Sequence, residues 1–206
     1  MISIKNLRLQ YGDEILFTDF NLSVNRGENV VLLGPSGTGK SSILHLLLGF
    51  VKPQAGEIKI DGISLSPSSI HKIRRKTAWL PQELNLHIDT VRELLSETFK
   101  LHINKKNEPS PASIEETLNA LDLDLSILNK KTNEISGGQK QRIMLASCIL
   151  LRKPLLLLDE PSSALDAESV ERLAKLIRAQ KGITVLSSSH DKKWIDHCDR
   201  VVNISQ

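Results

Sequence analysis

GPSGTGKS, residues 34–41, is the stretch from which the fold can be worked out. It matches the pattern G-x-x-x-x-G-K-[ST] in full. The compact apolar run Val30–Leu33 precedes it, and the helically spaced run Lys40–Leu48 follows and stops at Gly49. Glycines in such a loop let backbone N–H groups turn around phosphate oxygens, and the helix N-terminus adds a favourable dipole. The stretch therefore predicts a phosphate-binding loop between a buried strand and a helix.

The side chains of this loop indicate a nucleotide with a divalent cation. Lys40 is expected to reach the β- and γ-phosphates, and the Ser41 hydroxyl to ligate Mg²⁺. The competing interpretation is a glycine-rich turn with a chance lysine, which does not account for the strand before it and the helix after it. The other residues expected at the nucleotide are Gly34, Pro35, Ser36, Gly37, Thr38, Gly39 and Ser42.

An acidic stretch, LLLLDE at residues 155–160, completes such a site. Its leucines are typical of a strand buried on both faces, which delivers Asp159 and Glu160 to its carboxyl end. Asp159 is expected to hold Mg²⁺ through water. Glu160 lies one residue farther and could polarise an attacking water; the alternative is an ordinary turn or helix-start carboxylate.

The apolar pattern around these stretches predicts an α/β fold. Apolar residues alternate between Ile2 and Leu9, with the period of a half-buried strand. In the last quarter, strands at 155–158, 183–186 and 200–204 alternate with a helix at about 167–179 and with a shorter one. Strands that alternate with helices indicate a largely parallel sheet covered by helices.

The middle of the chain has a different character. From about residue 83 to 151 the pattern is mostly helical, so we expect a helical insertion in the α/β core. Ser113 and Glu116 fit a capping box ahead of one of its helices. The polar, proline-bearing stretch at 103–111 is expected to be an exposed loop.

Composition narrows the class of protein. The 206 residues suit one sizeable domain, and the net charge of +3 is too mild to indicate nucleic-acid binding. Cys148 and Cys198 form no paired motif, which favours reduced thiols. No apolar run approaches the ~20 residues that a bilayer requires, and the N-terminal stretch lacks the apolar segment of a signal peptide. We expect a soluble intracellular protein, with any membrane span supplied by another chain.

A second glycine-rich stretch, ISGGQ at residues 135–139, has no place in a P-loop kinase or GTPase. At a helix N-terminus, Ser136, Gly137 and Gly138 could offer a hydroxyl, backbone N–H groups and a dipole to a γ-phosphate. The stretch makes sense if that phosphate is bound by a second copy of the chain, so that two chains close each site with ATP between them.

With this stretch the chain resembles the nucleotide-binding subunit of an ATP-binding cassette (ABC) transporter over nearly its whole length. The signature of that family is usually LSGGQ, and Ile135 is a conservative replacement for its leucine. The resemblance adds Gln139 and Asp166 to the residues expected at the nucleotide.

The remaining motifs come in the order found in the family. The resemblance implies that Tyr11 stacks on adenine, although a tyrosine at a strand end often only packs. It implies that Gln82 contacts Mg²⁺ and the attacking water and links the core to the helical region. It also implies that residues 163–166 cross the dimer interface, and that His190 contacts the γ-phosphate and orients Glu160.

The resemblance also implies an organisation and partners. It predicts a single ABC ATPase domain at 1–206, with a core at about 1–82 and 152–206, a helical subdomain at about 83–151, and an antiparallel N-terminal β region. Such a subunit hydrolyses ATP with Mg²⁺ in a head-to-tail dimer with a second copy or a paralogous ATPase. It binds separately encoded transmembrane permease subunits, lies peripherally on the cytoplasmic face of the membrane, and has no nucleic-acid partner.

The family also suggests a docking surface and a direction of transport. The surface beside the glutamine loop receives a short helix from the membrane subunit, with core packing as the alternative for its apolar residues. These residues are Trp79, Leu84, Leu86 and Ile88. The stretches at 89–95 and 190–202 resemble small exporter ATPases, including a bacterial iron-export subunit, and favour an exporter, of a metal such as iron.

Two other functions remain as alternatives. The first is a soluble ABC protein that acts on ribosomes or DNA; the single cassette and the absence of sustained heptads argue against it. The second is a P-loop kinase, against which the ISGGQ stretch argues.

Overall fold

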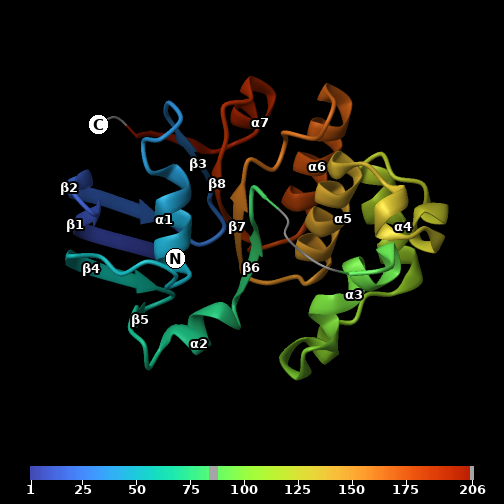
Figure 1. The fold of residues 1–206 in the computed structure, drawn as a ribbon, viewed down its shortest axis with the longest axis horizontal. Coiled ribbons are helices and arrows are strands. Elements are labelled where there is room, and N and C mark those ends of the chain that lie inside the picture. The colour runs from blue at the N-terminus through green and yellow to red at the C-terminus, as the bar shows by residue number, and fades with distance from the viewer. Residues whose placement is uncertain (84–87, 205–206) are drawn as a thin grey trace.

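The computed structural model describes residues 1–83 and 88–204 and contains two β-sheets (Figure 1). The first sheet is antiparallel, with the strand order β2-β1-β4-β5. Its strands are β1 (Ile2–Tyr11), β2 (Glu14–Val24), β4 (Ala55–Ile60) and β5 (Ile63–Ser64). This is the N-terminal β region that the sequence predicts.

The second sheet is parallel and has five strands, in the order β6-β7-β8-β3-β9. Its strands are β3 (Asn29–Leu33), β6 (Thr77–Leu80), β7 (Leu155–Asp159), β8 (Thr184–Ser188) and β9 (Arg200–Asn203). The predicted α/β class with a mainly parallel sheet is confirmed. The ends of β8 and β9 differ from the prediction by one or two residues.

Helix α1 (Lys40–Leu47) packs between the two sheets (Figure 1). Its apolar residues belong to one buried cluster with Ile4 of β1 and Val30 of β3, so a single core joins the sheets. The other face of the parallel sheet is covered by helices. Leu155 and Leu157 of β7 face α1, whereas Leu156 and Leu158 belong to the cluster on the other face. Alternate residues of one strand thus supply two cores, as expected for a strand buried on both faces.

The segment between β6 and β7 is mostly helical, as predicted. It contains α3 (Val91–Lys100), α4 (Pro111–Ala120), α5 (Gly137–Leu150) and three short 3₁₀ segments (His102–Asn107, Leu125–Asn129 and Thr132–Glu134). The remaining helices are α2 (Ile70–Arg74), α6 (Ala167–Ala179) and α7 (Lys192–Asp196). Within the described ranges, no helix has the length and apolarity to cross a bilayer.

Helix α5 is buried all round along its second half. Every residue from Ile143 to Leu150 is buried, and these residues pack in the core cluster that also holds β7. A helix with no polar face in this part has to lie between other elements. It therefore ties the helical segment to the parallel sheet.

The predicted capping box at Ser113 and Glu116 is wrong. The helix begins three residues earlier, because Pro111 occupies its first turn and Ser110 is the N-cap. The Ser110 hydroxyl accepts a hydrogen bond from the Ser113 N–H at 3.2 Å. Proline suits the first helical position because its fixed φ fits the helix and its missing N–H has no partner there.

The predicted exposed loop at 103–111 is wrong in part. Residues His102–Asn107 form a 3₁₀ segment in which Asn104 is buried. The Asn104 side chain donates to the Thr98 carbonyl at 2.7 Å and accepts from Lys153 Nζ at 2.5 Å. Lys153 is itself buried, and this desolvation lowers its pKa. A run of polar residues predicts an exposed loop. Here the partner that buries Asn104 is Lys153, which is distant in the sequence, so the local pattern could not indicate the burial.

The corrected start of α4 can be tested by mutation. Ser110→Ala should lower the free energy of unfolding by about 1 kcal/mol, because it leaves the Ser113 N–H without its cap. Ser113→Ala is the matched control, because it retains the capping oxygen and should cost less. Urea denaturation of both variants measures the difference. A larger loss from Ser113→Ala would restore the start at Ser113.

Candidate active site

The loop between β3 and α1 curls around its own lysine. Lys40 Nζ donates to the Gly34 carbonyl at 2.8 Å and to the Pro35 carbonyl at 2.7 Å. Thr38 Oγ1 also donates to the Pro35 carbonyl, at 2.9 Å. The lysine charge is therefore held within the curve of the loop, where a phosphate could replace the two carbonyl partners.

Two glycines fix the path of this loop by close packing. A Cβ on Gly39 would lie 2.9 Å from the Phe17 ring, and φ at Gly39 is +92°, in the left-handed region. A Cβ on Gly34 would lie 2.4 Å from the Ile204 carbonyl oxygen. A side chain at Gly34 would force the backbone to move, and one at Gly39 would strain the left-handed backbone and displace the Phe17 ring. The loop is thus shaped by contacts with β2 and with the end of β9.

Helix α1 begins without a side-chain cap. Its N-cap is Gly39, and no side chain accepts a hydrogen bond there. The N–H groups of the first helical turn, from Lys40 to Ser42, have no acceptor within the helix. They add to the positive end of the helix dipole, which favours an anion at this point. This geometry supports the predicted places of Ser41 and Ser42 beside a phosphate.

The carboxyl end of β7 carries the two predicted acids. Asp159 is 2% exposed, and its Oδ1 accepts a hydrogen bond from the Ser188 hydroxyl on β8. The chain then turns sharply, because Glu160 has φ +50°. The Glu160 N–H donates to the Ser188 carbonyl at 3.2 Å and to its hydroxyl at 3.1 Å. Ser188 therefore holds both acids, a role that the sequence analysis did not assign.

The Glu160 carboxylate lies beside His190. Its Oε2 is 3.1 Å from His190 Nδ1, with exposed fractions of 13% for the glutamate side chain and 78% for the histidine side chain. The contact is an ion-pair contact and not a hydrogen bond, so Oε2 is a buried acceptor without a hydrogen-bond donor among the described residues. Such an atom is costly unless water or a ligand supplies the donor. The arrangement suits a carboxylate that receives a proton from water.

Parallel pairing gathers the predicted residues at one edge of the sheet. β3, β8, β7 and β6 are consecutive neighbours, so the segments that follow them leave from the same edge. The phosphate loop follows β3, His190 follows β8, Asp159 ends β7, and Gln82 follows β6 in an exposed position. The sequence alone could predict that these residues lie at one edge, because the carboxyl ends of parallel strands lie at the same edge of a sheet.

Tyr11 comes to the same region from the other sheet. It ends β1 and is 43% exposed. Two residues earlier, Leu9 pairs with Phe17, the residue whose ring lies against Gly39. The hairpin therefore brings Tyr11 near the phosphate loop with its ring accessible, and adenine stacking remains a prediction.

The ISGGQ stretch forms the start of α5. The Ser136 hydroxyl accepts from the Gln139 N–H at 3.1 Å, and Gln139 Oε1 accepts from the Ser136 N–H at 3.0 Å. This capping box, an S-x-x-Q pattern that the sequence analysis overlooked, occupies the Gln139 side chain. The N–H groups of Gly137 and Gly138 are left without an acceptor in the helix. A Cβ on Gly137 would meet nothing within 4 Å, so this end is open.

Within one chain, the structure does not bring the two glycine-rich stretches to the same face of the sheet. α1 belongs to the core cluster on one face of the parallel sheet and α5 to the cluster on the other (Figure 1). Asp166 lies beyond Ser163 and caps α6, where its Oδ1 accepts from the Ser169 N–H at 2.7 Å. This backbone hydrogen bond is the main cause that lowers the pKa of Asp166.

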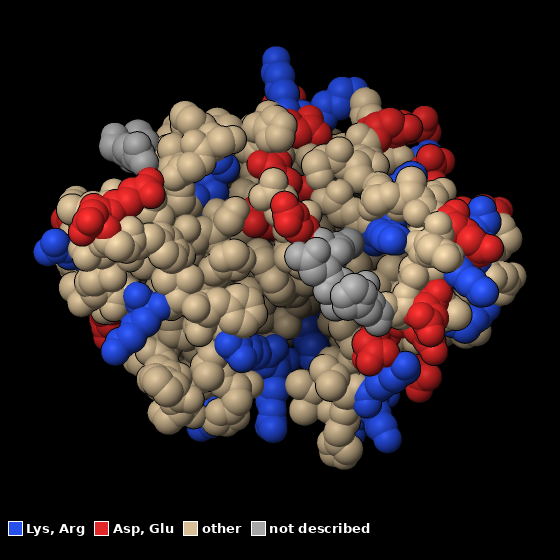
Figure 2. Space-filling model, in the orientation of Figure 1, with Lys and Arg blue, Asp and Glu red and all other residues tan. Residues whose placement is uncertain are grey.

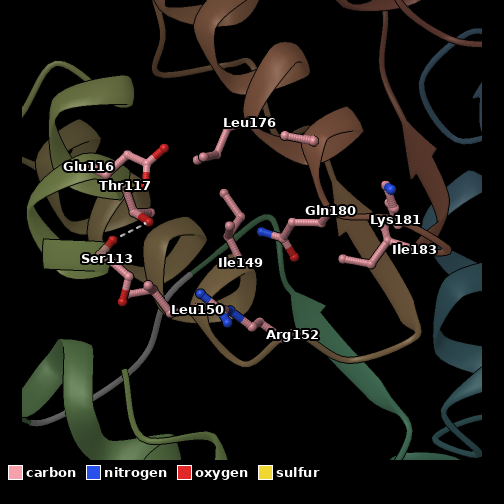
Figure 3. Close-up of a pocket in the computed structure, with 11 residues that line it drawn as sticks. Ser113, Glu116, Thr117, Ile149, Leu150, Arg152, Leu176, Gln180, Lys181 and Ile183 are labelled. Atoms are coloured by element: carbon pink, nitrogen blue, oxygen red, sulfur yellow. Dashed lines mark hydrogen bonds between the residues drawn. The ribbon is translucent and has the colours of Figure 1, made fainter. Parts of the chain in front are cut away.

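A cavity of about 410 Å³ lies elsewhere in the molecule (Figure 3). It opens between α4 and the ends of α5 and α6, with Ile149 and Gln180 in its lining. Arg152 and Ile183, which also line it, come just before β7 and β8. The cavity is therefore at the amino ends of these strands, at the edge of the sheet opposite to the acids and the phosphate loop.

A lysine held in a curled strand-to-helix loop, with two acids at the carboxyl end of a parallel strand two positions along the same sheet, defines a P-loop nucleotide hydrolase. The chain belongs to the ABC transporter family, whose model matches residues 17–163. This finding confirms the family inferred from the sequence motifs. The protein is an ATPase subunit of an ABC transporter.

Two curated relatives and one solved structure show the extent of the similarity. The ergothioneine transport ATP-binding protein EgtV of Helicobacter pylori (strain G27) is 34% identical over 199 residues, which cover 94% of this chain and 91% of the relative. The probable iron export ATP-binding protein FetA of Escherichia coli (strain K12) is 31% identical over 207 residues, which cover 99% of this chain and 91% of the relative. The solved structure is the ATP-binding cassette MJ0796 in a dimeric post-hydrolysis state bound to ADP and Pi. It matches this chain with a TM-score of 0.82 at 31% identity, and the match covers 100% of this chain and 94% of the MJ0796 chain.

The role of the loop lysine can be tested by binding. Lys40→Ala should weaken ATP binding roughly tenfold or more, because a charge-assisted contact with phosphate is lost. Isothermal titration of ATP measures the change. Lys105→Ala, which removes an exposed lysine from the 3₁₀ segment, is the control and should bind as the parent does. Unchanged affinity in Lys40→Ala would remove Lys40 from the nucleotide site.

Proposed function

We propose that this ATPase works as a head-to-tail dimer, with a second copy or a paralogous ATPase, in which each ATP is closed by two chains. The observation that carries the proposal is the placement of α1 and α5 on opposite faces of one sheet. Each helix presents uncapped N–H groups, and the start of α5 is open at Gly137. In one chain the two ends serve different faces, whereas two chains in opposite orientation can bring them to one phosphate.

The proposal includes Mg²⁺ at each ATP, held in part by the nucleotide phosphates. Among the described residues, no group of three or more His, Cys, Asp or Glu could hold a metal ion. The oxygens of Ser41, Gln82 and Asp159 fit the preference of Mg²⁺ for a few protein ligands beside phosphate. When bound, Mg²⁺ would neutralise charge on the phosphates.

Glu160 is proposed as the group that accepts the proton of the attacking water. Its buried Oε2, for which residues 1–83 and 88–204 supply no hydrogen-bond donor, supports this role, since a water could donate to it. His190, 3.1 Å away and largely exposed, is proposed to contact the γ-phosphate and to hold the carboxylate in place. Lys40 is proposed to bind the transferred phosphate as a fixed positive charge.

Coupling to separately encoded transmembrane permease subunits is proposed to use an aromatic cluster that includes Trp79, three residues before Gln82. Phe50 is 58% exposed; the Arg74 guanidinium carbon lies 4.9 Å from its ring centroid. The His45 ring lies 6.0 Å from that of Phe50 and 5.6 Å from that of Trp79. An exposed aromatic ring held in this way suits an apolar side chain of a partner helix.

The structure describes two of the four predicted docking residues, Ile88 and Trp79. Ile88 is partly buried and packs against the core cluster of the helical segment, which supports the core-packing interpretation for it. Trp79 packs partly against the core between the sheets. Leu84 and Leu86 lie outside the described residues.

Location and cargo follow from the same proposal. The subunit would lie on the cytoplasmic face of the membrane through its permease, and export of a metal such as iron is supported by the similarity to FetA. The similarity to EgtV, named for ergothioneine transport, supports a different cargo. Sequencing the neighbouring membrane-protein gene and measuring metal retention in a deletion strain would distinguish the two cargoes.

Figure 2 shows basic and acidic side chains interspersed on the visible face, unlike the basic stripe of a nucleic-acid binder.

The proton-accepting role predicts a separation of binding from turnover. Glu160→Gln should bind ATP as the parent does and lose about 10²-fold or more in turnover, because the amide cannot take the proton. A coupled assay for released ADP, with ATP titration alongside, measures both quantities. Similar turnover in variant and parent would exclude Glu160 as the base.

The shared site predicts a nucleotide-dependent dimer. Glu160→Gln protein should be dimeric with ATP and monomeric with ADP, because ADP lacks the phosphate that both chains contact. Adding Gly137→Asp should abolish the dimer through like-charge repulsion, while the open space around Gly137 lets the subunit fold and bind ATP. Light scattering measures the mass. Ser126→Asp, which adds the same charge at another exposed position, should still dimerise. A dimer that forms equally with ADP, or persists in Gly137→Asp, would contradict the shared site.

A further inference from the structure

The backbone carbonyl of Glu160 is a meeting point of hydrogen bonds. It accepts from the Ser163 N–H at 3.2 Å and from the Ser163 hydroxyl at 2.9 Å. It also accepts from the side-chain amide of Gln141, at 3.3 Å. The same Gln141 nitrogen donates to the Ser163 hydroxyl at 2.8 Å. Three donors from two separate segments thus converge on one oxygen.

These bonds hold a residue in an unfavourable backbone conformation. With φ at +50°, Glu160 is in the left-handed region, which a residue with a Cβ adopts only where its surroundings impose it. On its amino side the N–H is fixed by Ser188, and on its carboxyl side the carbonyl is fixed by Ser163 and Gln141. The direction of the carboxylate depends on both sets of bonds.

Gln141 belongs to a different part of the molecule from the residues that it holds. It lies on α5, just over one turn from Ser136, at the end of the helix that is open toward a partner. The first turn of α5 also touches the segment after Glu160: a Cβ on Gly138 would lie 3.5 Å from the Ala164 Cβ. A shift of α5 would therefore change the bonds to the Glu160 carbonyl.

We propose that Gln141 is a positioning residue that couples the placement of α5 to the orientation of the Glu160 carboxylate in the same chain. The coupling between sites rests on the proposed dimer. There, a γ-phosphate held by one chain and gripped by residues 136–138 of the other would draw in α5 of that second chain. Through Gln141, this movement aligns the second chain's own Glu160. Each ATP thus prepares the carboxylate of the other site.

The first test removes the donor. Gln141→Leu has a similar size and no amide, and it should lower kcat roughly three- to tenfold, the rate equivalent of one net hydrogen bond. The KM for ATP should change less than twofold, because Gln141 contacts the Glu160 backbone and Ser163 and not the phosphate loop. The Hill coefficient for ATP should fall toward 1, which a loss of stability alone would not produce.

The second test is a double-mutant cycle with Ser163→Ala. Both side chains donate to one carbonyl and to each other, so the loss in kcat of the double variant should differ from the product of the two single losses. Ser163 is exposed, so its variant is expected to fold even if Gln141→Leu does not. Gln180→Leu is the matched control; it makes the same chemical change in the lining of the distant cavity and should leave kcat and the Hill coefficient unchanged.

The outcomes separate this inference from the proposed function. Unchanged kcat in Gln141→Leu, or independent effects in the cycle, would overturn the positioning role even if ATP still produces a dimer. Coupled effects on kcat in a protein that never dimerises would support the positioning role and contradict the shared site. A fall in kcat with an unchanged Hill coefficient would overturn the coupling between sites.

Discussion

The burial of β7 on both faces is the constraint on which the rest of the structure depends. All five of its residues are buried, so the strand is stable only with apolar cover on each side. α1 supplies the cover on one face and α5 on the other. The same constraint fixes the position of the acidic residues. A strand that is apolar up to its last residue can carry charged groups only at its end. Asp159 and Glu160 occupy that end, at the same edge of the sheet as the loop that leaves β3, with β8 between the two strands.

The cost of placing acids there explains the role of Ser188. A carboxylate at 2% exposure needs a hydrogen-bond donor, and the register of β7 and β8 sets Asp159 opposite Ser188, whose hydroxyl donates to it. Glu160 carries two further costs, a left-handed backbone and a buried Oε2 that has no hydrogen-bond donor in the described part of the chain. Each is of order 1–3 kcal/mol, and such costs persist where the surrounding structure imposes them and a reaction uses them. The resting protein thus holds Glu160 in a form that a water molecule would stabilise.

The parts of this structure that could be predicted are those encoded locally. The phosphate loop and the run LLLLDE each combine a strand pattern with the residues that follow it, so the sheet edge and its acids could be inferred from the chain alone. The sequence pattern places the N-cap of α4 at Ser113, whereas in the structure the N-cap is Ser110, the serine directly before Pro111. Contacts between segments that are distant in the sequence could not be predicted from local patterns. Lys153 with Asn104, and Gln141 with Glu160, are pairs that no local pattern marks, since each depends on how the helical segment packs on the sheet.

The two helix starts also explain why association in the proposed dimer would depend on the nucleotide. α1 begins at a glycine with no side-chain cap, and α5 leaves the N–H groups of Gly137 and Gly138 without acceptors in the helix. Both ends carry partial positive charge, so two copies that bring them together with nothing between them meet an electrostatic cost. An anion with free oxygens on both sides removes that cost and supplies acceptors to both sets of N–H groups. A terminal phosphate can do so, and its cleavage and release would return the two positive ends to repulsion. Association would then be favourable only while the phosphate is present, which lets hydrolysis open the site without any further device.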